Sequence, residues 1–166
     1  MRKISANLIF DGLGNFLKNG IIVLNDDAVV LDLIDTGGDL KESEGIEFYN
    51  GLLVPGFVNC HCHIELSHLK DRISANTGIT DFIKAVNTKR DISEIEQKKS
   101  IETADKEMSV SGIVAVGDIS NNDLSFGIKK ISKIAYHTFI ELFGLNKEKS
   151  EFNFRKAKEI FIKNRE

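Results

Sequence analysis

The first 50 residues alternate short apolar, β-branched runs with clusters of turn-forming residues. The runs Ile21–Leu24 and Ala28–Ile34 are separated by Asn25-Asp26-Asp27, a connection typical of a β-hairpin. Two further strands are expected over Ile4–Phe10 and Ile46–Tyr49, and no helical spacing interrupts the pattern. We therefore predict that residues 1–51 form a small β-sandwich or part of one.

The pattern changes at Leu52, where strand-like and helix-like segments begin to alternate. Leu52–Cys60 is almost continuously apolar, as expected of a parallel strand buried on both faces. Ser93 and Glu96 form a capping box that opens a helix, and Gly112 can end it. The other expected elements are helices over Thr80–Val86, Asp123–Ile131 and a C-terminal segment around Phe154–Phe161, and strands over Ile113–Val116 and Tyr136–Phe143. This order predicts a parallel α/β layer over residues 52–166.

Two histidines, His61 and His63, lie where the Leu52–Cys60 strand is expected to end. Because the side-chain period of a strand is two, both imidazoles project from one face, while Cys60 and Cys62 project from the other. Active sites of parallel α/β proteins form at the carboxyl ends of strands, and imidazole is the commonest metal ligand. The two histidines are therefore a candidate half of a metal site, because a catalytic zinc needs at least three protein ligands.

The segment GLLVPGFVNCHCHIELSHL, residues 51–69, resembles the first barrel strand of the amidohydrolase superfamily, whose pattern is P-G-[FL]-[VI]-[ND]-x-H-x-H. Within it, the chain is similar to the branch of triazine hydrolases and nucleoside or nucleobase deaminases, and most resembles deaminases of adenosylhomocysteine and aminodeoxyfutalosine type. The resemblance implies a small composite β-sandwich over residues 1–51. It also implies the first three or so βα units of a TIM-like (β/α)8 barrel over residues 52–166.

The resemblance also implies the chemistry of the complete enzyme, which is hydrolysis by metal-activated water, with one divalent ion, zinc or alternatively iron. His61 and His63 match the two metal histidines of the first strand. The family's later ligands and its proton-transferring glutamate lie on the fifth, sixth and eighth strands. At roughly 31 residues per βα unit, the residues after Leu52 reach only three to four units. No catalytic acid or base is therefore expected here, and we expect this chain alone to be inactive.

Two other functions stay open. A truncated, non-catalytic relative would bind metal weakly or act in protein interactions. A cyclic-amide hydrolase of dihydroorotase or imidazolone type would keep catalysis but change the reaction.

Four more polar residues occupy positions where substrate contacts are expected. Glu65 shares the parity of the two histidines, and His68 follows in the same loop. Asp118 and Glu141 come near the ends of the next two strands. Each has an ordinary structural alternative: a solvated or hydrogen-bonded loop residue, a helix cap, or an ion-pair partner. For Cys60 and Cys62, packing as small buried residues is favoured over a metal-binding or redox role.

Composition narrows the class of protein further. The 166 residues carry a net charge of −3 and no basic block, so nucleic acid is not an expected partner. The apolar runs are too short to span a bilayer, and the start lacks the features of a secretory signal, so a cytoplasmic location is expected. Three βα units leave an open sheet edge. We therefore expect the chain to associate with a second copy, or with the rest of a barrel, and to act on a small-molecule substrate.

Overall fold

The computed structural model of the protein describes residues 1–41, 45–74, 76–142 and 147–164. The chain divides into two compact units, Met1–Gly56 and Phe57–Glu166. An antiparallel sheet precedes parallel β-α units, so the expected α/β class is confirmed at this level. Among the described residues, none of the helices is both long and apolar enough to cross a membrane.

The first unit is built around its longest strand, β1 (Arg2–Phe10). One edge of β1 pairs antiparallel with β3 along its first half and with β2 along its second half, while the other edge pairs parallel with β5. β4 extends the sheet antiparallel to β3. The other strands are β2 (Phe16–Lys18), β3 (Ile21–Leu24), β4 (Val30–Ile34) and β5 (Ile46–Leu53). Ala6, Ile9, Val23 and Leu24 form the buried core of this unit.

Two expectations for this unit need correction. The strand β2 was not predicted, because three residues between turns carry too little periodicity to read. Leu52 and Leu53 do not begin a new strand but continue β5, where they pair with Leu8 and Ile9. Within the described part of residues 1–56 the strands form one sheet, so the second layer of a sandwich stays a prediction.

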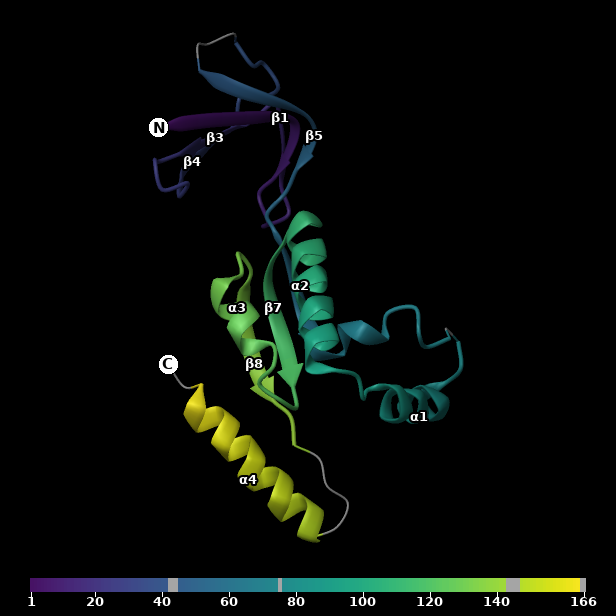
Figure 1. The fold of residues 1–166 in the computed structure, drawn as a ribbon. Coiled ribbons are helices and arrows are strands. Elements are labelled where there is room, and N and C mark those ends of the chain that lie inside the picture. The colour runs from purple at the N-terminus through teal and green to yellow at the C-terminus, as the bar shows by residue number, and fades with distance from the viewer. Residues whose placement is uncertain (42–44, 75, 143–146, 165–166) are drawn as a thin grey trace. The chain divides into compact units, whose positions relative to one another are not determined.

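The second unit is a three-stranded parallel sheet with helices between its strands, as the alternating pattern predicted (Figure 1). The strand order is β6-β7-β8, and α2 lies alongside β7. The strands are β6 (Phe57–Cys62), β7 (Ile113–Ser120) and β8 (Ala135–Ile140). The helices are the 3-10 helix η1 (Ile64–Leu69), α1 (Ile79–Lys89), α2 (Glu94–Val110), α3 (Phe126–Ile131) and α4 (Lys147–Lys163).

The helix α2 begins and ends where local sequence chemistry requires. The Ser93 hydroxyl accepts a hydrogen bond from the Glu96 amide at 3.3 Å, and the Glu96 carboxylate accepts one from the Ser93 amide. This reciprocal pair is the predicted capping box. After the helix, Gly112 adopts φ 85°, a conformation that favours glycine.

The predicted burial of the histidine-bearing strand is wrong for this chain. β6 is an edge strand, and Phe57 and Val58 are 58% and 61% exposed. Apolar composition records which residues prefer burial, but it does not supply the neighbouring strand that would cover them. β8 lies at the other edge among the described strands, so association through an open edge stays a prediction. Phe143, the last residue of the expected third strand, lies outside the described residues.

Candidate metal centre and adjoining cavity

The strand β6 ends at Cys62, directly before His63, and changes register across Cys60 and His61. Asn59 pairs with Val116 and Cys62 with Asp118, so two residues of β6 lie opposite Gly117 alone. The Asn59 side chain accepts a hydrogen bond from the His61 amide at 3.2 Å within this irregularity. A bulge of this kind re-aims side chains, and bulges are frequent beside functional sites. The sequence does not show this bulge, because the histidine spacing alone suggests a regular strand.

His61 and His63 project to a common side. Their ring centroids lie 5.3 Å apart with an interplanar angle of 62°. Two imidazoles on one tetrahedral ion, with Zn–N bonds of about 2.0–2.1 Å, place their centroids about 5 Å apart. The His63 Nδ1 atom is buried and has no hydrogen-bond partner among the described residues. The pair therefore fits two ligands of one metal ion.

Within the described part of the chain, no third ligand lies beside this pair. Among the described residues, no group of three or more His, Cys, Asp or Glu side chains is arranged to hold a metal ion. His137 on β8 packs instead against Phe139, with ring centroids 4.6 Å apart. The expectation that the chain supplies two ligands stays a prediction.

Asp118 does not lie on the histidine side of the sheet. It is fully buried beside Cys62, and its carboxylate forms an ion pair with Lys129 of α3. It also accepts hydrogen bonds from the Ile64 amide at 2.8 Å and the Ser120 hydroxyl at 2.9 Å. The ion pair with Lys129 matches the lysine pairing that was its structural alternative, and its expected substrate contact stays a prediction.

Glu65 is also fully buried and bound to backbone. Its Oε2 atom accepts from the amides of Asn121 at 3.0 Å and Asn122 at 3.2 Å, which ties η1 to the segment after β7. Burial raises the pKa of Glu65, and the two amide hydrogen bonds oppose that shift. The alternative expectation, a solvated loop glutamate, is wrong because Glu65 is 0% exposed. Its expected role beside the substrate stays a prediction.

His68 is 5% exposed and lies at the end of η1. It lines a cavity of about 600 Å³ between η1 and α2, together with Lys70, Arg72 and Lys99. Burial lowers the pKa of His68 below the ordinary histidine value. His63 lines the same cavity, so the two histidines border a common space.

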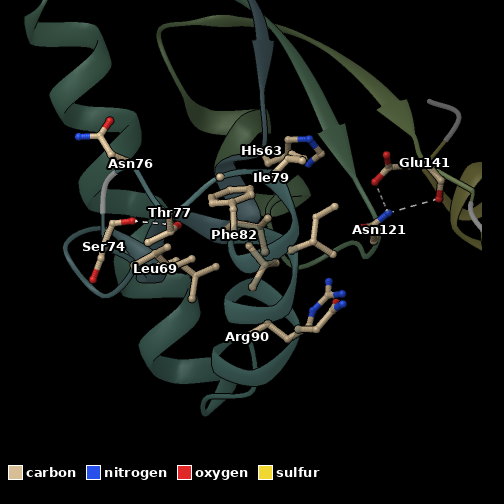
Figure 2. Close-up of a pocket in the computed structure, with 16 residues that line it drawn as sticks. His63, Leu69, Ser74, Asn76, Thr77, Ile79, Phe82, Arg90, Asn121 and Glu141 are labelled. Carbon is tan, nitrogen blue, oxygen red and sulfur yellow. Dashed lines mark hydrogen bonds between the residues drawn. The ribbon is translucent and has the colours of Figure 1, made fainter.

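A larger cavity, of about 1010 Å³, adjoins His63 (Figure 2). One wall is the apolar side of α1, formed by Ile79, Phe82, Ile83 and Val86, and Arg90, Asn121 and Glu141 supply polar groups. The Asn121 side chain donates to the Glu141 carboxylate at 3.0 Å. Of the four expected substrate-contact residues, Glu141 is the one that lines this cavity with His63.

Two of these lining residues, Arg90 and Asn121, were missed in the sequence. The helix α1 itself was predicted, because its apolar residues recur at helical spacing, but no role at the site was assigned to it. In the structure α1 has no buried residues, and Phe82 is 47% exposed toward the cavity.

The cysteines only partly follow the packing interpretation. Cys62 is half-buried on the helix side, where burial raises its pKa to about 11 and the Asp118 charge adds to the shift. Cys60 is exposed, because it lies on the edge strand within the register change. The expectation that Cys60 is buried is therefore wrong.

The fold of this chain is shared with proteins of known structure. The chain has the fold of the N-terminal portion of amidohydrolases of the deaminase and chlorohydrolase branch, and the resemblance read from residues 51–69 is confirmed. Helicobacter pylori aminofutalosine deaminase, solved with methylthio-coformycin, is 22% identical with a TM-score of 0.72. The match covers 96% of this chain and 40% of that one.

Two other relatives extend this finding. Arthrobacter aurescens atrazine chlorohydrolase, solved with zinc, is 16% identical with a TM-score of 0.64, over 90% of this chain and 37% of that one. Adenine deaminase 1 of Rhizobium etli is 35% identical over 88 residues, which is 49% of this chain and 15% of that protein. No protein-family model matches the chain. The chain thus spans less than half the length of each of these relatives.

Proposed function

We propose that this chain is the N-terminal part of a metal-dependent amidohydrolase that catalyses hydrolytic deamination or dechlorination of a nucleoside or another heterocycle. The observation that carries the proposal is the pair of imidazoles, 5.3 Å apart, at the carboxyl end of a parallel strand. The similarity to two deaminases and a zinc-bound chlorohydrolase supports the reaction class. It does not select one substrate.

His61 and His63 are the residues that would hold the ion, with zinc as the first candidate and iron as the second. When bound, such an ion supplies a lowered pKa for water and so a nucleophile at neutral pH. The groups that move the proton are proposed to lie outside this chain, and the 166-residue polypeptide alone is proposed to be inactive.

The cavity beside His63 suggests how this chain contributes to substrate binding. The apolar wall of α1 suits the body of a planar heterocycle, and the hydrogen-bonded pair of Asn121 and Glu141 offers both donor and acceptor groups. We therefore assign Glu141 a substrate-binding role within the proposal. Asp118 and Glu65 are assigned to support of the backbone, because their carboxylates accept protein hydrogen bonds.

Zinc binding by the chain tests this proposal directly. Isothermal titration of the metal-free chain with zinc is expected to show one site, weakened by the incomplete ligand set, that is lost in the H61A/H63A variant. His137→Ala is the matched control, because this histidine packs on Phe139 instead of on the pair, and its variant is expected to bind zinc normally. Equal zinc binding by the native chain and H61A/H63A would overturn the proposal.

A further inference from the structure

The backbone that carries His63 leaves the sheet with little support from neighbouring strands. β6 is an edge strand, its register shifts between Asn59 and Cys62, and it ends at Cys62. The next amide after His63, that of Ile64, is held by a side chain. It donates to the Oδ1 atom of Asp118 at 2.8 Å.

Asp118 is itself immobilised by a buried network on the helix side of the sheet. Asp118 is 0% exposed, and its partner Lys129 is 6% exposed. The Lys129 ammonium also donates to Ser120 Oγ at 3.2 Å and to Thr138 Oγ1 at 3.0 Å. The Ser120 hydroxyl donates in turn to Asp118 Oδ2 at 2.9 Å. The network therefore joins α3, β7 and β8 to the first residue of η1.

A buried ion pair is a poor source of stability, because removing two charges from water offsets most of their attraction. The position of this pair suggests another use. We infer that Asp118 is a positioning residue, which fixes the backbone at Ile64 and so aims the His63 ring at the His61 ring. The inference rests on the proposed metal site, and partners behind a metal ligand commonly set its affinity in this way.

Two double variants separate positioning from simple stability. D118N/K129M removes both charges but keeps a side-chain oxygen for the Ile64 amide. D118L/K129M is its apolar counterpart, without an acceptor, and replacement of a buried pair by apolar residues of similar volume is often tolerated. If the leucine variant fails to fold, D118S/K129M replaces it, since a serine hydroxyl is too short to reach the amide. D105N is the control, because Asp105 receives hydrogen bonds from Ser132 and Tyr136 but not from η1.

The first measurement needs no metal. Nuclear Overhauser contacts between the His61 and His63 rings, together with hydrogen exchange of the Ile64 amide, report the geometry in the metal-free chain. Both are expected to be native in D118N/K129M and D105N. In the acceptor-free variant the ring contact and the amide protection are expected to be lost, although cooperative unfolding is kept. An unchanged ring contact in that variant would overturn the inference.

Zinc titration of the same variants is the second measurement. The acceptor-free variant is expected to bind zinc about 10–100-fold more weakly than the native chain, while the asparagine variant retains native affinity. Equal affinity in the two double variants would also overturn the inference. If the native chain binds no zinc at His61 and His63, the proposed function fails, but the ring contact still decides whether Asp118 positions His63.

Discussion

On the helix side of the β6-β7-β8 sheet, Val116, Asp118 and Ser120 are almost completely buried, whereas on the other side Phe139 is 52% exposed beside His137. Parallel strands are usually covered on both faces. Here the helices cover one face, and the candidate metal ligands project from the other. The comparison separates two tasks within three strands, because one face carries the packing and the buried ion pair while the other carries the chemistry.

The largest expected effect is on the free energy of unfolding, and it differs between the two faces of the sheet. Ile101 of α2 is 0% exposed, so I101A removes buried methyl groups and leaves a cavity. We expect it to lower the free energy of unfolding by about 2–5 kcal/mol. The matched change on the open face, F139A, is expected to cost about 1 kcal/mol or less, because half of that ring already meets water. Urea unfolding monitored by circular dichroism measures both, and equal losses would contradict the division of tasks.

The two cysteines of β6 allow thiol reactivity to be compared within one strand. Because burial raises the pKa of Cys62 to about 11, little thiolate is present at pH 8. We expect Cys62 to be alkylated about 100-fold more slowly than an ordinary thiol, and the exposed Cys60 to react first. Mass spectrometry of iodoacetamide-treated C60S and C62S variants measures each rate separately. Similar rates in the two variants would show that the helix side is open at β6.

The smallest expected effect concerns the buried carboxylate that ties η1 to the segment after β7. Burial raises the folded pKa of Glu65 above its unfolded value, so folding is penalised as the pH rises through the folded pKa. Glu65→Gln removes this penalty and keeps an oxygen for the two amides. The variant is therefore expected to be more stable than the native chain at pH 7, by about 1 kcal/mol or less, and equally stable near pH 4.

Thermal unfolding at the two pH values checks this, with E102Q on the exposed side of α2 as the control. The stability of the glutamine variant relative to the native chain is expected to rise from pH 4 to pH 7. If it falls instead, the assigned direction of the Glu65 pKa shift is wrong.

Local sequence patterns were sufficient to predict features whose geometry depends on residues within one helix or strand. The capping box at Ser93, the glycine that follows α2, and the alternation of strands and helices after residue 56 were all readable, because each depends on neighbours within a few residues. His61 and His63 do lie on a common side as expected, but the strand ends at Cys62 and is irregular at His61, so regular alternation is not the reason. The amidohydrolase resemblance also depended on one short segment.

Only the tertiary structure decided which face each strand residue joins and what covers it. Asp118 and Glu141 both follow the rule that sites form at strand ends, yet one meets Lys129 beneath the sheet and the other lines the cavity. The exposure of β6 and the bulge at Asn59 depend on pairing with a strand more than 50 residues away. Spacing along a chain encodes direction relative to adjacent residues, but burial and partners are set by segments that the chain brings together only on folding.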